Sequence, residues 1–429
     1  MTRKVERPSG GLNRLLALAA VCLLLLTSHV AAQTPRAGAR LHETRKPAVP
    51  IRFDRGKSAR KIPFELHDNN IYLKARVNGS RPLWFLFDTG AGVSVLDAGV
   101  AKALGLRSDG KAEINAGGGN IESTILGGLT VKLPGAAAFD QLMVFTALDS
   151  FPPLVGHAVD GIIGHDLIKQ FVVEVDYAAR TISLYDPAGY VYAGRGEIVP
   201  VGVEGREPLV SVKLGMAGGD MIEGRFTVDT GSTTTLWMSR HFVETHGLLE
   251  KLSGASLARF GAGLGGESKV VHARAREVRL GRFQIDSPVV RLSQEEKGFY
   301  AETKHAGTIG GEILRRFKVF LDYPHGRMIL EAGARLAEPY EDDMSGLDLT
   351  TAGRDFKTFK ILRVTPHTPA SEAGLRAGDV IEMIDSRPAR RLTLDIIGRM
   401  FRRDGKTFTL QITRGRRSVR AILKLRRLV

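Results

Sequence analysis

From about residue 61 onward, short apolar runs alternate with turns rich in Gly, Pro and Asp, a pattern that predicts many short strands. The clearest run is "LWFLFDTGAG" (Leu83–Gly92), whose consecutive apolar residues predict a strand buried on both faces. It ends on Asp88, and a charged group is costly to bury unless something specific uses it. The same pattern returns in "GRFTVDTGST" (Gly224–Thr233), where a second buried strand ends on Asp229.

The two Asp-Thr-Gly sites belong to a longer internal repeat. Each is followed by a predicted helix and a glycine-rich patch, "INAGGGNIES" and "RFGAGLGGES". Each copy closes on a similar segment, "DGIIGHDLIKQFVVEVDY" and "AGTIGGEILRRFKVFLDY", with a short helix expected after "IIG" and "TIG". The aspartates are 141 residues apart, and Gly164 and Gly310 of the closing segments are 146 apart. We therefore expect a duplicated, strand-rich unit.

Two pseudo-symmetric units can bring Asp88 and Asp229 into one site. Two carboxylates a few ångström apart in a poorly solvated cleft cannot both ionise easily, so the pair keeps one proton. Such a pair can hold a water, with one carboxylate accepting its proton while the other donates a proton to the carbonyl under attack. This chemistry hydrolyses an amide without a cofactor or metal, and neither is expected.

The residues after each aspartate are expected to support this pair. The threonines would bond across the two loops, and the glycines would allow close approach of the backbone. The supporting residues are Thr89, Gly90, Thr230, Gly231 and Ser232. The hydroxyl of Ser232 can donate to Asp229, whereas Ala91 at the matching position has nothing to donate. On this hypothesis Asp229 carries the charge and Asp88 the proton.

With its two D-T-G motifs, "IIG" and "TIG" segments and doubled glycine-rich patches, the chain resembles the retropepsin-like aspartic proteases, with both lobes in one polypeptide. The resemblance covers roughly residues 61–335 and implies lobes at 61–193 and 194–338, with Asp88 and Asp229 catalytic. It also implies flaps that close over an extended peptide, containing Gly117, Gly118, Gly119, Gly261, Gly263 and Gly265. The chain departs from viral members at His165 and Gly311, where an Arg-Asn pair is absent.

The C-terminal stretch contains "AGLRAGDVIEMI" and resembles a bacterial PDZ domain over residues 346–429. In such domains a peptide adds as a strand between an edge strand and a helix. The helix would follow Thr393 as its N-cap and run through "LDIIGRMFRR". Gly346, Leu347, Leu349 and Ile397 are the candidate groove residues, although core packing is an alternative role for Ile397.

Residues 1–32 have the pattern of a secretory signal peptide. Four basic residues precede the 12-residue apolar run Leu15–Leu26, and small residues lead to a cleavage site after Ala32. The only cysteine, Cys22, lies in this segment. Residues 33–60 are predicted to be a flexible basic linker. A periplasmic location is expected, with an extracellular protein or an uncleaved N-terminal membrane anchor as alternatives.

The basic surplus is concentrated near the C-terminus. From Thr351 onward, 19 Lys and Arg stand against 7 Asp and Glu. Export argues against nucleic acid as a partner, so an acidic protein or an anionic membrane surface is the expected partner, and a merely solvated basic face is the alternative.

The sequence thus predicts a mainly β protein, with two pseudo-symmetric lobes forming one cleft and a small α+β domain behind them. The expected function is an exported aspartic endopeptidase acting on polypeptides, with a PDZ unit that recruits a substrate or partner. The expected state is a monomer whose lobes form a pseudo-dimer. The alternative is a non-catalytic periplasmic peptide-binding or scaffold protein on the same fold.

Overall fold

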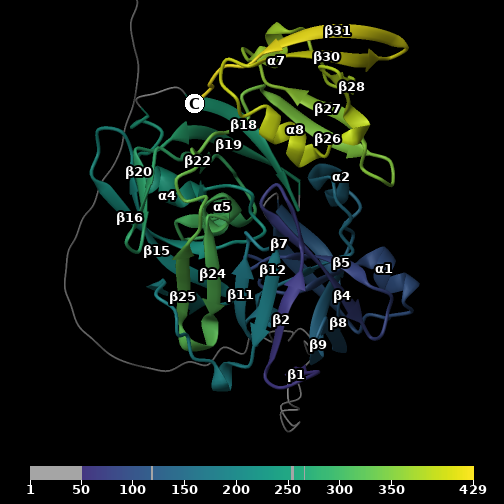
Figure 1. Cartoon of the computed structure of the whole chain (residues 1–429), viewed down its shortest axis with the longest axis vertical. Helices are drawn as coiled ribbons and strands as arrows, with labels where there is room; N and C mark the ends of the chain where they lie inside the picture. Colours follow the sequence, from purple (N-terminus) through teal and green to yellow (C-terminus); the bar gives the residue numbers. More distant parts are fainter. Residues whose placement is uncertain (1–50, 117–118, 253–255, 265) are drawn as a thin grey trace, which may run out of the picture. The chain divides into compact units, whose positions relative to one another are not determined.

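The computed structural model describes residues 51–116, 119–252, 256–264 and 266–429. The described chain is mainly β, as predicted (Figure 1). The signal peptide and residues 33–50 of the expected linker lie outside the described residues. The linker prediction is wrong for residues 51–60, because β1 (Ile51–Phe53) pairs with β9 and β2 (Ser58–Pro63) pairs with β12. Neighbouring strands satisfy the backbone of a segment whose composition shows no periodicity.

Lobe 1 is built on a sheet that contains nine strands of the described chain. Its strands are β1, β3 (Glu65–His67), β4 (Asn70–Val77), β5 (Leu83–Phe87), β6 (Val95–Asp97), β7 (Gly110–Ala116), β8 (Gly119–Leu133), β9 (Ala136–Thr146) and β10 (Gly161–Ile163). Its helices are α1 (Ala98–Ala103), α2 (Phe151–Val155) and α3 (His165–Ile168). The predicted short helix after "IIG" is α3.

Lobe 2 repeats this arrangement on a sheet with ten described strands. They are β14 (Gly202–Glu204), β15 (Glu207–Gly215), β16 (Met221–Val228), β17 (Leu236–Met238), β18 (Ser256–Gly263), β19 (Gly266–Arg274), β20 (Glu277–Leu280), β21 (Phe283–Asp286), β22 (Val289–Ser293) and β23 (Gly307–Ile309). The helices are α4 (Arg240–Thr245), α5 (Phe299–Glu302) and α6 (Gly311–Leu314). In both lobes the short strand before the last helix runs parallel to the strand that ends on the aspartate.

A third sheet joins the lobes. Its described strands are β2, β11 (Val172–Asp176), β12 (Thr181–Tyr185), β13 (Glu197–Pro200), β24 (Phe317–Asp322) and β25 (Arg327–Ala332). The central contact is the antiparallel pair of β11 and β24, which are the matching "VDY" and "LDY" segments of the repeat. One hydrophobic cluster runs through both lobes and this sheet, so the lobes share a core.

The C-terminal unit has a separate hydrophobic cluster of its own. Its sheet contains β26 (Leu347–Ala352), β27 (Thr358–Val364), β28 (Val380–Ile384), β29 (Arg387–Pro388), β30 (Thr407–Arg414) and β31 (Arg417–Lys424). Its helices are α7 (Pro369–Glu372) and α8 (Leu394–Met400), the latter capped by Thr393 as expected. Strand β26 is an edge of this sheet.

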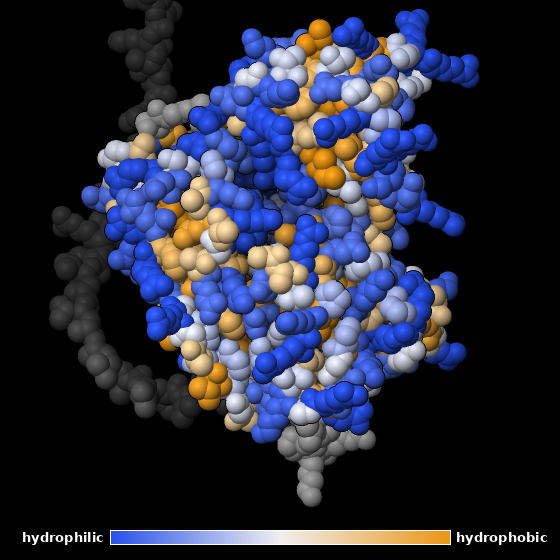
Figure 2. Space-filling model, viewed as in Figure 1, coloured by the Kyte–Doolittle hydropathy of each residue, from blue (hydrophilic) through white to orange (hydrophobic). Residues whose placement is uncertain are grey.

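The face shown in Figure 2 is largely hydrophilic, with hydrophobic side chains in smaller groups. Among the described residues, no helix has the length and apolar character that crossing a membrane requires.

Candidate active site

The two Asp-Thr-Gly loops meet where β5 and β16 end. The backbone N–H of Asp88 donates to Ile163 of β10 at 3.0 Å, and that of Asp229 donates to Ile309 of β23 at 3.0 Å. Each aspartate is therefore held by the parallel strand of its own lobe. The buried strands and the strands beside them fix the backbone position of each aspartate. Both aspartates remain partly exposed to solvent.

Thr89 and Thr230 lock the loops to each other, as the sequence led us to expect. The N–H of each donates to the hydroxyl of the other, at 3.1 and 3.0 Å. Each hydroxyl then donates to a carbonyl of the opposite lobe, Thr89 to Val228 at 2.6 Å and Thr230 to Phe87 at 2.8 Å. All four bonds are buried and cross between lobes, so neither loop can shift without breaking them.

Gly90 and Gly231 each pack against the carboxylate of the other lobe. A Cβ atom on Gly90 would lie 2.6 Å from Cγ of Asp229, and one on Gly231 would lie 2.4 Å from Cγ of Asp88. Neither distance is possible for a real side chain. Glycine is required here because the partner carboxylate occupies the space of a Cβ, not because of a positive φ.

The two carboxylates interact directly, and the pKa of each is raised. Burial raises the pKa of Asp88, while backbone N–H donors from Ala91, Gly90 and Gly231 and a hydrogen bond with Asp229 oppose that rise. Burial raises the pKa of Asp229 well above its ordinary value, and the charge of Asp88 raises it further. Because the two carboxylates interact, the pair titrates as a unit and keeps one proton above the ordinary pKa of aspartate.

The sequence-based hypothesis of which aspartate holds the proton rests on a contact between the Ser232 hydroxyl and Asp229, and it stays a prediction. The Ser232 hydroxyl lies 3.0 Å from the Thr234 hydroxyl, and its backbone N–H donates to Asp229 at 3.0 Å. The N–H of Ala91 makes the equivalent bond to Asp88 at 3.1 Å. The two loops thus offer similar donors, and the additional Gly231 donor favours the charged form at Asp88.

The glycine-rich patches form two hairpins, each of which contacts the opposite lobe. Near the end of β7, Asn115 donates from Nδ2 to Glu302 Oε2 of α5 at 2.9 Å. At the turn after β18, Leu264 packs against a buried cluster of lobe 1 that includes Tyr72 and Leu86. Of the predicted flap glycines, Gly119, Gly261 and Gly263 lie in these strands, whereas Gly117, Gly118 and Gly265 lie outside the described residues.

A cavity of about 310 Å³ lies between the C-terminal unit and the lobes. The C-terminal unit contributes β26 and one face of α8, and lobe 2 contributes the loop after Asp229. Its lining includes Leu154, Val155, Thr233, Thr234, Thr235, Leu347, Leu349, Leu394, Gly398, Phe401 and Arg402. Neither Asp88 nor Asp229 lines this cavity, so it is separate from the carboxylate pair.

Helix α2 of lobe 1 lies against this unit (Figure 1). The carbonyl of Pro153 accepts from the hydroxyls of Thr350 and Thr351 at 3.3 and 2.8 Å. A Cβ on Gly156, whose φ is +65°, would lie 3.1 Å from Cβ of Leu394 at the start of α8. Helix α2 therefore lies at one end of the space between β26 and α8.

Comparison with known families agrees with both resemblances. Residues 73–167 match the family model described as aspartyl protease, and residues 360–414 match the PDZ domain model. The chain carries an aspartyl protease domain and a PDZ domain. The protease match covers most of lobe 1, and lobe 2 repeats its strands and its Asp-Thr-Gly loop. A search of curated proteins found no match.

The PDZ domain corrects one predicted groove residue. Ile397 is fully buried in the domain core, so the prediction that it lines a peptide groove is wrong. Leu347 and Leu349 do line the cavity, and Gly346, with a φ of +78°, packs against Thr368. The apolar stripe of α8 faces the core. The residues that line the cavity are spaced three or four positions apart, as expected for one face of a helix, and they are Leu394, Gly398, Phe401 and Arg402.

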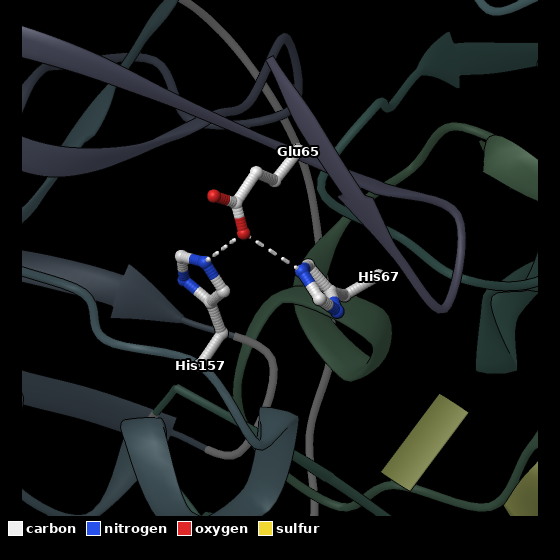
Figure 3. A group of neighbouring side chains, drawn as sticks. All are labelled: Glu65, His67 and His157. Atoms are coloured by element: carbon white, nitrogen blue, oxygen red, sulfur yellow. Dashed lines mark hydrogen bonds and ion pairs between the residues drawn. The ribbon is translucent and has the colours of Figure 1, made fainter. Parts of the chain in front are cut away.

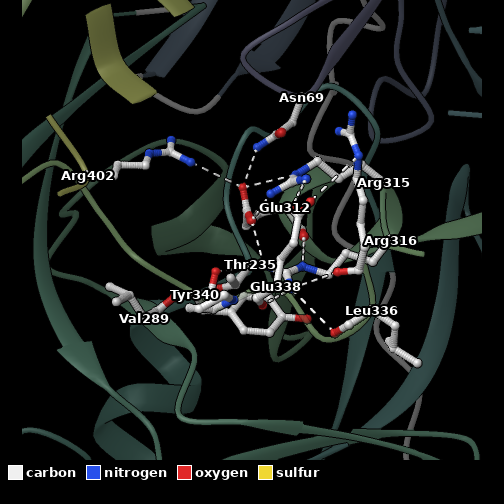
Figure 4. Close-up of polar contacts among 12 residues, drawn as sticks. Asn69, Thr235, Val289, Glu312, Arg315, Arg316, Leu336, Glu338, Tyr340 and Arg402 are labelled. Atoms are coloured by element: carbon white, nitrogen blue, oxygen red, sulfur yellow. Dashed lines mark hydrogen bonds and ion pairs between the residues drawn. The ribbon is translucent and has the colours of Figure 1, made fainter. Parts of the chain in front are cut away.

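Glu312 of α6 ties the three domains together (Figure 4). Its carboxylate pairs with Arg315 at 2.6 Å, Arg316 at 2.9 Å and Arg402 of the PDZ domain at 3.4 Å. It also accepts from Asn69 Nδ2 of lobe 1 at 2.9 Å. The same Asn69 Nδ2 donates to the Thr233 carbonyl at 2.8 Å, in the loop that follows Asp229.

Sequence reasoning missed several of these residues. Glu312 directly follows the two glycines of the "TIGG" segment. An acidic residue at this position of a repeated motif was a signal that could have marked Glu312 as a candidate. Arg259 of β18 had no such signal, because its partners are distant in sequence. It is buried and donates to the Leu347 carbonyl at 3.0 Å and to Asp348 at 2.7 Å. Strand β18 of the second hairpin is thereby connected to the edge strand of the PDZ domain.

Within the described ranges, one group of side chains has the composition of a metal site, and it lies apart from the carboxylate pair. It consists of Glu65, His67 and His157. The sequence predicted no metal site, and no local spacing suggested this group, because His157 lies 92 residues from Glu65.

Proposed function

We propose that this protein is an exported aspartic endopeptidase in which Asp88 and Asp229 activate a water between them. The observation that carries the proposal is the pair of adjacent carboxylates with raised pKa values on loops locked by Thr89 and Thr230. One carboxylate accepts a proton from the water as it attacks the peptide carbonyl, and the other donates a proton to the carbonyl oxygen.

The proposed substrate is a polypeptide held in extended form beneath the two hairpins. Contact of each hairpin with the opposite lobe, through Asn115 and Leu264, supports a cleft that closes over its substrate. The rings of Trp237 and Tyr300 in lobe 2 stack with centroids 4.5 Å apart, and burial and the charge of Asp229 raise the pKa of Tyr300.

The PDZ domain is proposed to recruit a substrate or partner by adding its peptide along β26. The exposed basic residues Arg416, Arg417, Arg420 and Lys424 at the β30–β31 hairpin support an acidic protein or an anionic membrane surface as a second contact. Export to the periplasm is part of the proposal. N-terminal sequencing of the exported protein should then begin at Gln33.

A digest of casein and of a peptide library tests the proposed activity. Wild-type protein should cleave both, and a pepstatin-type inhibitor should block cleavage. Asp88→Asn and Asp229→Asn should each lower kcat by about 10²-fold to 10⁴-fold or more, because an amide cannot shuttle the shared proton. Asp109→Asn, which changes an exposed aspartate, is the matched control.

If wild-type protein binds library peptides without cleaving them at any pH, the protein is a peptide-binding scaffold and the proposal fails. If either single asparagine variant keeps near-wild-type turnover, the shared-proton mechanism fails.

A further inference from the structure

We propose that Glu65, His67 and His157 form a binding site for a divalent transition-metal ion of the zinc class. Their ligand atoms all lie within 4.8 Å of one another. Strand β3 supplies Glu65 and His67, and the loop after α2 supplies His157. Figure 3 shows both imidazole rings turned toward one carboxylate oxygen.

Two of the three separations fit a tetrahedral ion. Oε2 of Glu65 lies 3.2 Å from Nε2 of His67 and 3.3 Å from Nε2 of His157. Ligand atoms around a tetrahedral zinc ion with bonds of about 2.05 Å are about 3.3 Å apart. The ligand nitrogens of the two histidines lie within 4.8 Å of each other, and the side chain of His67 is 22% exposed.

The hydrogen bond between Nδ1 of His157 and the backbone of Ala158 indicates which ring nitrogen carries the hydrogen. Nδ1 is 2.7 Å from the carbonyl oxygen of Ala158, which can only accept, so Nδ1 carries the hydrogen. In the neutral ring Nε2 then presents a lone pair toward Glu65. Two acceptors 3.3 Å apart require a cation or a proton between them, and a backbone carbonyl behind the ring is the usual support of a metal-binding histidine.

Aromatic rings hold this imidazole in place. Tyr72 stacks on His157 with ring centroids 4.1 Å apart, and Trp84 meets it edge-on at 4.9 Å. His157 is itself buried, whereas Glu65 is exposed. The site is thus rigid on the histidine side and open on the carboxylate side, which allows an ion to enter.

The donor set selects the class of ion. Two imidazole nitrogens and one carboxylate oxygen suit Zn²⁺ and its neighbours, whereas Mg²⁺ and Ca²⁺ prefer oxygen ligands alone. A bound ion would connect strand β3 to His157, which directly follows the C-cap residue Gly156 of α2. Because α2 lies against the PDZ domain, the ion would also steady that contact.

Isothermal titration of the untagged full-length protein with Zn²⁺, after removal of metals by a chelator, tests the site. Wild-type protein should bind one ion per chain, and Mg²⁺ should not compete. Glu65→Gln, His67→Gln and His157→Gln should each bind at least about tenfold more weakly. His325→Gln is the matched control, since His325 also lies beside a carboxylate, that of Asp322 at 2.5 Å, but has no second histidine.

Co²⁺ supplies a second measurement, because its visible absorption distinguishes four-coordinate from six-coordinate sites. Hydrogen exchange of residues 151–160 should slow on addition of Zn²⁺ in the wild type and not in Glu65→Gln. Absence of stoichiometric binding, or equal binding by wild type and all three variants, would overturn the proposal. The contacts of Glu65 with His67 and His157 would then be ordinary hydrogen bonds. Should His157→Gln fail to fold, the variants of exposed Glu65 and of His67 decide the question. None of these measurements depends on proteolytic activity.

Discussion

At the scale of single residues, the carboxylate pair follows from local chemistry that two tripeptides encode. The Asp-Thr-Gly triplets contain the acid, the hydroxyl that crosses to the other loop and the only residue without a Cβ. The sequence therefore indicated the roles of Thr89, Gly90, Thr230 and Gly231 before their contacts were known. It could not give the backbone donor that Gly231 of the opposite lobe supplies to Asp88, because that contact forms only when the two lobes meet.

The cross-loop bonds predict the effect of Thr230→Val. This change keeps the shape but leaves the Thr89 N–H without an acceptor and the Phe87 carbonyl without a donor. Each unsatisfied buried group costs about 1–3 kcal/mol, so we expect a loss of about 2–6 kcal/mol in the free energy of unfolding and reduced kcat. Urea denaturation and peptide turnover measure both. Thr230→Ser keeps the hydroxyl and should retain most of the stability; equal losses in both variants would contradict the hydrogen-bond explanation.

The raised pKa of Asp229 predicts a pH-dependent gain in stability for Asp229→Asn. Burial and the charge of Asp88 keep a proton on the pair in the folded state, whereas the unfolded aspartate loses its proton above about pH 3.9. The stability that the protonated group contributes is fully present below that pH and is lost as the pH rises through the folded-state pKa. Asparagine does not titrate.

The melting temperature of Asp229→Asn relative to wild type should therefore rise between pH 4 and pH 7. Differential scanning calorimetry at the two pH values measures it, with Asp109→Asn as the control for the amide substitution. A constant difference between Asp229→Asn and wild type would show that the folded and unfolded states bind protons equally at this position.

At the scale of elements, short segments with weak sequence signals contact several domains. Phe151 and Val155 of helix α2 pack against the same lobe 1 cluster as Leu264 of the second hairpin, and α2 also contacts β26 of the PDZ domain. Strands β1 and β2 were expected to be linker because their composition resembles one. Pairing of their backbones with β9 and β12 makes both segments edge strands in spite of this composition. The sequence of the two segments does not contain this information, because it depends on the neighbouring strands.

If α2 covers one end of the peptide groove, loosening it should improve peptide binding. The double variant Thr350→Val, Thr351→Val removes both donors to the Pro153 carbonyl. At about 0.5–1.5 kcal/mol per bond, the two bonds contribute about 1–3 kcal/mol, so affinity for a peptide with a free C-terminal carboxylate should rise by about fivefold to about 10²-fold. Fluorescence anisotropy with a labelled peptide measures the change. Thr358→Val, at an exposed position of β27, is the control, and unchanged affinity in the double variant would mean that α2 does not compete with peptide.

At the scale of the whole molecule, the PDZ domain is connected to the protease lobes by buried charges. Arg402 reaches Glu312, and Asp348 pairs with buried Arg259 on a hairpin strand. Deleting residues 346–429 would remove both partners. We therefore expect such a deletion to weaken cleavage of short peptides as well, unlike an appended domain joined only by a linker.

Glu312→Gln tests this connection. Burial opposes ionisation of Glu312, but Arg315, Arg402 and Arg316 outweigh burial and lower its pKa. The charged group therefore contributes stability above the unfolded pKa of about 4.3, and this contribution is lost as the pH falls through the lower folded-state pKa. Glutamine should cost about 3–5 kcal/mol at pH 7, with the difference from wild type shrinking in acid.

Chemical denaturation at pH 7 and pH 3 measures this cost. Glu341→Gln removes a more exposed carboxylate that pairs with Arg274 and Arg427, and should cost only about 0–1 kcal/mol. Equal effects of the two substitutions would show that Glu312 is an ordinary surface charge.

The sequence by itself determined the duplicated β unit, the aspartates, the glycines and threonines around them, and the PDZ signature. These features repeat or sit close together along the chain, so local propensity and motif spacing contain them. Only the tertiary structure decided which face of α8 meets the cavity, how Glu312 joins three domains, and that Glu65 meets His157 across 92 residues. Such contacts arise when distant strands pack, and the free energy of burying shared apolar surface, rather than any local pattern, brings them together.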